Sequence, residues 1–156
     1  MNIDSGIHAS DREAIVDGLN RLLADTFTLY LTTHNFHWNV TGPMFHSLHG
    51  MFLAQYTELW NAVDPIAERI RSLGNVTPGS YEAFKRLGTL PDAPSVPPKA
   101  LEMVATLAHA HESVVRAARL LLDRAHQVND APTSDLLSQR MAAHEQAAWM
   151  LRALLA

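Results

Sequence analysis

Apolar residues recur every three or four positions along four long stretches of the chain. This spacing places them on one face of an α-helix. The stretches cover approximately residues 10–39, 44–73, 98–127 and 133–155. In the first of them the repeating positions are Ile15, Leu19, Leu22, Thr26 and Tyr30. The pattern predicts an all-α fold of four long amphipathic helices.

Turn-forming residues interrupt the pattern between these stretches. Thr41-Gly42-Pro43 separates the first two, and Asn129-Asp130-Ala131-Pro132 separates the last two. Gly74 follows the second stretch, where a glycine commonly ends a helix. Short connections of this kind predict that each pair of helices folds as an antiparallel hairpin.

The connection between the second and third helices is much longer. Residues 75–98 hold five of the eight prolines, with a short helix expected at Tyr81–Leu87. A long crossover of this kind is the feature that separates the ferritin-like form of the four-helix bundle from a simple up-and-down bundle. We therefore expect a single ferritin-like domain over residues 1–156.

Composition excludes several classes of protein. The chain has no cysteine, so a metal must be held by His, Asp or Glu. Its net charge is −4 and it has only two lysines, which disfavours direct binding to DNA, although divalent cations could bridge the two. No apolar run reaches the ~20 residues of a membrane helix, and no secretory leader is visible, so we expect a cytoplasmic protein.

Histidines and acids gather on the first helix hairpin. His37 precedes the Gly42-Pro43 turn and His49 follows it, each by five or six residues, so the two lie at similar heights on neighbouring helices. Asp64 and Glu68 lie one turn apart on one face of the second helix. Imidazole and carboxylate together suit a divalent transition metal.

One chain cannot bring all four residues to one ion. Asp64 follows His49 by fifteen residues, which is about 22 Å along a helix. A single site would need two chains with antiparallel second helices, related by a two-fold axis that creates two equivalent sites. The alternatives are that the histidines are structural, and that Asp64 and Glu68 pair with Arg69 and Arg71.

These motifs resemble a known family. The run HNFHWNVTGPMFHSLHGMF, followed by YTEL and by D-x-x-AERIRSLG, resembles the Dps family of mini-ferritins from starved and oxidatively stressed bacteria. The final HEQAAWMLRALL is similar to the family's fourth helix, so the resemblance covers nearly the whole chain.

The resemblance implies a shell of twelve subunits. We expect this shell in the cytoplasm, with association with the nucleoid as an alternative. Ferrous iron would be oxidised by hydrogen peroxide between two-fold-related subunits and stored as a ferric mineral. The matching positions assign His37 and His49 to one subunit's share of each site, and Asp64 and Glu68 to the other's.

Leu53 departs from the family pattern, which has an acidic ligand four residues after the second histidine. Leucine has no donor atom, so we expect weaker binding of the second of two irons. His46 and His34 are possible replacement ligands, and an imidazole-rich site would make zinc a stronger competitor.

The resemblance also points to residues around the site. Trp38 would be a nearby redox-active aromatic or a packing residue, and we expect Trp60 and Trp149 to be packing residues. Asp130 and Asp135 would line iron-entry pores or cap the fourth helix. His109 and His111 are expected to be ordinary helix residues.

Three functions compete at this stage. The first is a ferroxidase and iron-storage cage, and the second a structural protein that shields DNA. The sparse lysines argue against the second, and we expect no direct DNA binding. The third is a cage with a degenerate site that binds zinc or little iron. Leu53 is the feature that supports this third function.

Overall fold

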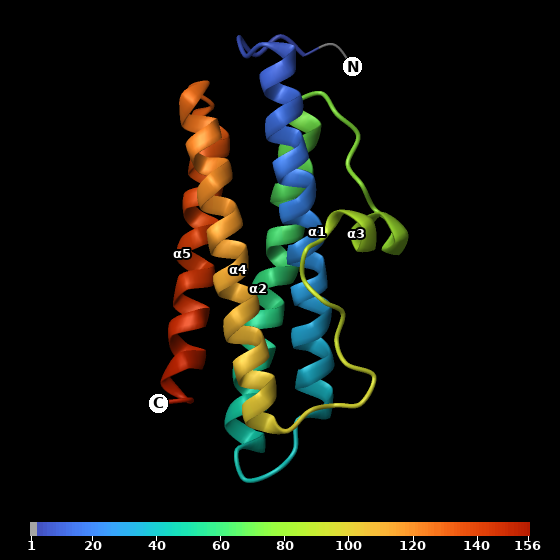
Figure 1. The fold of residues 1–156 in the computed structure, drawn as a ribbon, viewed down its shortest axis with the longest axis vertical. Coiled ribbons are helices and arrows are strands. Elements are labelled where there is room, and N and C mark those ends of the chain that lie inside the picture. The colour runs from blue at the N-terminus through green and yellow to red at the C-terminus, as the bar shows by residue number, and fades with distance from the viewer. Residues whose placement is uncertain (1–2) are drawn as a thin grey trace.

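A computed structural model describes residues 3–156 (Figure 1). Four long helices lie side by side, with a short fifth helix on the outside of the bundle. They are α1 (Ala9–Asn39), α2 (Phe45–Ser72), α3 (Tyr81–Leu87), α4 (Ala100–Gln127) and α5 (Ala131–Ala153). These bounds lie within two residues of the predicted ones, α3 matches its prediction, and residues 3–156 contain no strand.

The helix hairpins form where the turn residues predict them. Gly42 has φ +101° between α1 and α2, and Gly74 has φ +97° after α2. At the end of α2 the amide of Gly74 donates to the carbonyl of Arg71 at 2.9 Å, and the amide of Asn75 donates to that of Ile70 at 3.3 Å. This pair of bonds is a Schellman motif, and glycine is favoured in it because it lacks a Cβ.

The core is built from all four long helices. Its largest members have almost no exposed surface: Ile15, Leu19, Phe36, Phe52, Leu59, Ile66 and Met103. α1 packs mainly against α2, and α4 mainly against α5. The bundle is therefore two hairpins packed together. None of the helices among residues 3–156 has the length and apolarity needed to cross a membrane.

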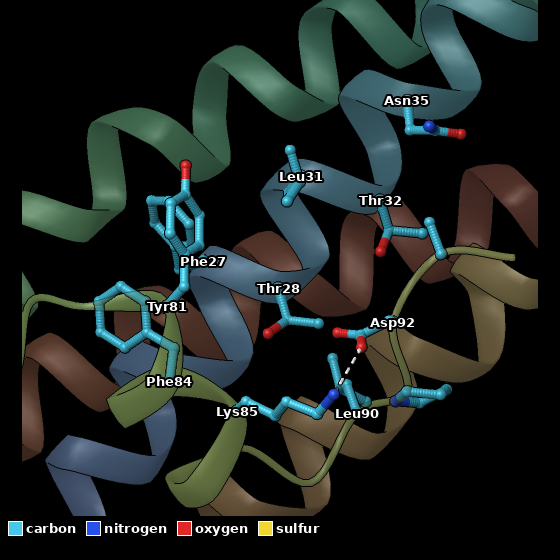
Figure 2. Close-up of a pocket in the computed structure, with 12 residues that line it drawn as sticks. Phe27, Thr28, Leu31, Thr32, Asn35, Tyr81, Phe84, Lys85, Leu90 and Asp92 are labelled. Carbon is cyan, nitrogen blue, oxygen red and sulfur yellow. Dashed lines mark ion pairs between the residues drawn. The ribbon is translucent and has the colours of Figure 1, made fainter. Parts of the chain in front are cut away.

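One buried carboxylate attaches the crossover to the bundle. Asp25 of α1 accepts hydrogen bonds from the amide and hydroxyl of Thr89, at 2.6 and 2.8 Å, and from the amide of Leu90 at 3.0 Å. A pocket opens beside this attachment, between α1, α3 and the crossover (Figure 2). Its walls carry Phe27, Tyr81 and an exposed Lys85–Asp92 ion pair, and no histidine.

Candidate metal centre

His37 and His49 meet across the first hairpin. His37 lies in the last turn of α1 and His49 in the second turn of α2. Their rings stack with centroids 3.7 Å apart and planes 22° apart. The Nδ1 of His37 is 2.8 Å from the carbonyl oxygen of His49, and the Nδ1 of His49 is 2.9 Å from the carbonyl oxygen of His37. The two side chains therefore hold each other in place through the backbone.

These reciprocal bonds fix the tautomer of both rings. A carbonyl oxygen only accepts hydrogen bonds, so each Nδ1 must carry the proton and donate. Each Nε2 then keeps its lone pair, which is the form in which histidine binds a metal. A backbone carbonyl behind Nδ1 is also the usual support for a metal-binding histidine, because it orients the ring. The pair is preorganised as two imidazole donors.

Asp64 and Glu68 are exposed on α2, one helical turn apart. The neighbouring arginines are directed elsewhere. Arg69 donates to the hydroxyl of Thr133 at 2.8 Å and to the carboxylate of Asp130 at 2.6 Å, while Arg71 donates to the carbonyl of Asn75 at 2.8 Å. The alternative in which Arg69 and Arg71 neutralise Asp64 and Glu68 is therefore not the arrangement in this chain.

The two pairs stay apart within the chain. In the described residues 3–156, no three His, Asp or Glu side chains come together as a metal-binding group. His49 and Asp64 both lie on α2, and their fifteen-residue separation is about 22 Å along the helix. His37 with His49 and Asp64 with Glu68 are thus two separate pairs, which we call the two candidate half-sites.

His49, Asp64 and Glu68 share one outward-facing line of α2. Positions on this line follow one another at steps of four and seven residues, the spacing of a single helix face. We call it the α2 outer stripe: Phe45, His49, Leu53, Trp60, Asp64 and Glu68. Leu53 is 44% exposed and Trp60 56% exposed. The expectation that Trp60 and Trp149 pack in the core is wrong, because Trp60 falls on this outer face and Trp149 of α5 is 67% exposed.

An aromatic cluster lies beside the histidine pair. The ring of His34 stacks on Tyr56 with centroids 3.9 Å apart and lies 4.0 Å from Trp38. The His34 Nδ1 is 3.2 Å from the hydroxyl of Tyr30. Burial, followed by the charge of His37, lowers the pKa of His34. Trp38 is 60% exposed and His46 is also exposed on α2.

Asp130 and Asp135 occupy different environments. Asp130 is the N-cap of α5 and accepts from the amide and hydroxyl of Thr133 at 3.1 and 2.6 Å, besides its ion pair with Arg69. Burial alone would raise the pKa of Asp130, but these hydrogen bonds outweigh it and the pKa falls. Asp135 is exposed and accepts from the side chain of Gln139 at 2.8 Å. The geometry of Asp130 matches the capping alternative.

A second histidine pair is buried between α4 and α5. His111 is 2% exposed and His144 is 1% exposed, and their Nδ1 atoms lie 2.9 Å apart. Arg140 contacts the Nε2 of His144 at 3.4 Å and forms a two-pronged ion pair with Glu58 of α2. Treating His111 as an ordinary helix residue missed this cluster. Its position one turn after the buried Leu107 would have revealed it.

Comparison with known proteins places the fold in a class. A family model for ferritin-like domains matches residues 16–156. A low temperature-induced protein of Nostoc is 40% identical over 151 residues, which cover 96% of this chain and 84% of that protein. A DNA protection during starvation protein of Brevibacillus brevis is 35% identical over 137 residues, covering 88% and 91% of the two chains.

A solved structure agrees with these relatives. The Dps protein of Vibrio cholerae, described as a member of a broad superfamily of ferritin-like diiron-carboxylate proteins, superposes with a TM-score of 0.93. The sequence identity is 26%, and the match covers 100% of this chain and 98% of that one. This chain belongs to the Dps family of ferritin-like proteins.

Proposed function

We propose that this protein is a ferroxidase and iron-storage cage that removes ferrous iron together with hydrogen peroxide. Two ferrous ions would each give one electron to a peroxide. The peroxide takes up two protons, its O–O bond breaks to give two water molecules, and two ferric ions remain. The ferric product would be stored as mineral inside a shell of twelve subunits. This reaction consumes both reagents from which hydroxyl radicals form.

The reciprocal bonding of His37 and His49 carries this proposal. It supports a ligand role because it leaves two Nε2 lone pairs on adjacent, fixed rings. Asp64 and Glu68 supply the complementary donors, since ferrous iron binds both imidazole and carboxylate. Their exposed position keeps both carboxylates accessible to a second chain.

The α2 outer stripe supports an antiparallel pairing of two chains. Its members are symmetric about the point between Tyr56 and Thr57: Phe45 mirrors Glu68, His49 mirrors Asp64, and Leu53 mirrors Trp60. A two-fold axis at that point places each His49 opposite Asp64 of a second copy, and each Leu53 opposite Trp60. Exposed apolar side chains at positions 45, 53 and 60 suit such an interface.

Leu53 favours a second candidate, a cage whose sites oxidise iron weakly. A carboxylate at this position would add a donor and a negative charge, and leucine adds neither. With Leu53 facing Trp60 across the axis, this part of the stripe would be an apolar contact. Such a site would hold one ion firmly and the second poorly. Zinc would compete well there, because two imidazoles with carboxylates suit tetrahedral zinc. His34 and His46 stay candidate replacement ligands.

Two neighbouring roles belong to the same proposal. Trp38 lies next to His37 and is exposed, so it is placed to intercept oxidising equivalents that escape the site. Asp135 is the better candidate for an iron-entry pore, because its carboxylate is exposed. The Asp130 carboxylate is occupied by Thr133 and Arg69.

Direct protection of DNA is not part of the proposal. With two lysines and a net charge of −4, the chain has few cations to neutralise phosphates. We expect assembled protein to leave plasmid DNA unretarded at moderate salt, except where a divalent cation bridges them. Clear retardation in the presence of a chelator would show that a direct DNA-binding surface exists.

Iron titration tests the ferroxidase proposal. Ferrous iron is added anaerobically to the assembled protein and binding is measured, after which peroxide is added and its consumption is measured. We expect saturable binding and one peroxide consumed for every two irons. The absence of binding, or iron oxidation no faster than in buffer, would refute the proposal.

A further inference from the structure

A pocket of about 240 Å³ opens between α2 and α5, on a different face of α2 from the outer stripe. Apolar side chains from both helices form its walls: Met51, Ala54, Ala143, Ala147 and Met150. Gln55 and Glu58 of α2 add polar groups, and His111 reaches the pocket from α4. The pocket therefore gives access to the buried histidine pair.

Two residues that line this pocket have buried polar atoms without partners. The amide nitrogen and oxygen of the Gln55 side chain and the Nε2 of His111 are buried. None of these three atoms has a hydrogen-bond partner among residues 3–156. His111 is 2% exposed and Gln55 9% exposed. A buried polar atom without a partner costs about 1–3 kcal/mol, so such atoms usually face a bound molecule or water.

Arg140 determines which ring nitrogen of each histidine carries the proton. A guanidinium only donates, so the Nε2 of His144 must be the acceptor of its contact with Arg140. The proton of His144 is then on Nδ1, which donates to the Nδ1 of His111 at 2.9 Å. The proton of His111 is consequently on Nε2. The chain of bonds runs from Arg140 through His144 to His111 and ends in an unpaired N–H of a residue that lines the pocket.

The N–H on His111 decides which class of ligand the pocket can bind. A metal would need a lone pair on His111 Nε2, so the proton of His111 would have to move to Nδ1. His144 would then carry its proton on Nε2, and that N–H would face the N–H groups of Arg140. Both rings are uncharged at neutral pH, since burial lowers the pKa of His111 to about 4 and that of His144 well below its usual value. Glu58 and Arg140 compensate each other. A charged ligand would find no opposite net charge in the pocket.

We propose that this pocket binds a small uncharged molecule that has a hydroxyl or carbonyl oxygen on an apolar body. The oxygen would accept from the Nε2–H of His111, and a ligand hydroxyl would donate to the amide oxygen of Gln55. The apolar body would lie between Met51, Ala147 and Met150. This inference is independent of the proposed iron chemistry, because it uses none of the residues of the two half-sites.

Methyl NMR on the assembled protein tests the proposal. With the methionine methyls labelled with ¹³C, Met51 and Met150 report on the pocket and buried Met103 serves as the internal reference. Three probes share one ring: benzyl alcohol, toluene and benzoate. We expect saturable shifts of Met51 and Met150 with benzyl alcohol, and binding at least about tenfold weaker for the other two. Toluene has no oxygen to accept from His111. Benzoate can accept, but its negative charge would be buried without a counter-charge.

Two variants and a control complete the test. Ala147→Leu fills the pocket without touching the polar chain, and it should abolish the shifts. Ala142→Leu adds the same bulk at an exposed position of α5 outside the pocket and should leave them unchanged. His111→Phe removes the donor and should equalise benzyl alcohol and toluene. No shifts with any probe, equal binding of toluene to the unaltered protein, or tighter binding of benzoate would each overturn the proposal.

Discussion

The molecule holds two histidine pairs, each joining the helices of one hairpin, with opposite chemical outcomes. In the first hairpin, His37 and His49 each direct Nδ1 to a backbone carbonyl of the other helix. In the second hairpin, His111 and His144 direct Nδ1 to each other, and Arg140 lies behind them. What Nδ1 contacts therefore decides whether Nε2 presents a lone pair or an N–H.

Burial reinforces the contrast. Desolvation holds the pKa of His111 and His144 low, in the core beside Gln55, Glu58 and Arg140. His37 is 8% exposed, and His49, which belongs to the α2 outer stripe, is half-buried. Under our proposal the first pair meets a second chain, whereas the second pair lies beside the pocket between α2 and α5, which His111 lines. The number of histidines alone does not distinguish a metal-binding histidine from one that donates a hydrogen bond.

The largest effect is expected from removing one histidine of the first pair. His49→Ala deletes an Nε2 ligand atom and also leaves the carbonyl of His37 without the hydrogen bond that it accepts from His49 Nδ1. Changing groups that merely support a metal ligand costs 10–100-fold in affinity, so we expect loss of the ligand itself to weaken ferrous binding by about 100-fold or more. Anaerobic iron titration measures it.

The matched comparison uses the buried pair. His144→Phe should leave iron affinity within about twofold of the unaltered protein, provided that the shell assembles, and His126→Ala on the surface of α4 controls for loss of an exposed imidazole. If His144→Phe weakened iron binding as much as His49→Ala, the two pairs would not have separate roles.

The second effect is on stability at acid pH. The folded-state pKa of His111, about 4, lies below its unfolded value near 6.5, so the unfolded chain binds more protons between these values. Stability should therefore fall as pH drops from about 6.5 to about 4, by about 3 kcal/mol for His111 alone. Denaturant unfolding at a series of pH values measures the loss.

A variant without the titrating group isolates this contribution. His111→Gln should flatten the curve between pH 6.5 and 4, while His109→Gln, at an exposed position of α4, should not. An unchanged slope in His111→Gln would mean that other groups cause the acid sensitivity.

Much of the fold follows from sequence pattern, whereas parts of the site do not. Helix periodicity and turn residues predicted four long helices, and even the short α3, because these signals are local. The matching heights of His37 and His49 followed from counting residues to the turn. The carbonyl bonds that fix their tautomers did not, since they depend on how the two backbones pack.

Contacts between distant segments explain the remaining differences. Arg69 pairs with Asp130 rather than with the nearby acids, because α5 begins beside it. The buried pair joins residues thirty-three positions apart in separate helices. Trp60 was expected in the core, yet one helix carries both an inner and an outer apolar face. Sequence pattern alone does not tell which of these faces packs inside the bundle.

The smallest of these effects should come from restoring a carboxylate to the first site. Leu53→Asp adds a donor one turn after His49 and should increase the affinity for a second iron by about tenfold, a typical gain from one charge-assisted ligand. Leu120→Asp, which places the same charge on an exposed part of α4, is the control. No gain in Leu53→Asp would indicate that a neighbour such as His34 or His46 already compensates.

The claim that each site needs two chains can be tested by mixing half-sites. One chain carries His49→Ala, and the other carries Asp64→Ala with Glu68→Ala, so shells of either chain alone should be inactive. In shells co-assembled at equal ratio, random pairing restores an unaltered His49 opposite unaltered Asp64 and Glu68 in about a quarter of the sites. We predict about a quarter of the original iron oxidation. Co-assembled shells that stay as inactive as the separate ones would show that the site is not shared.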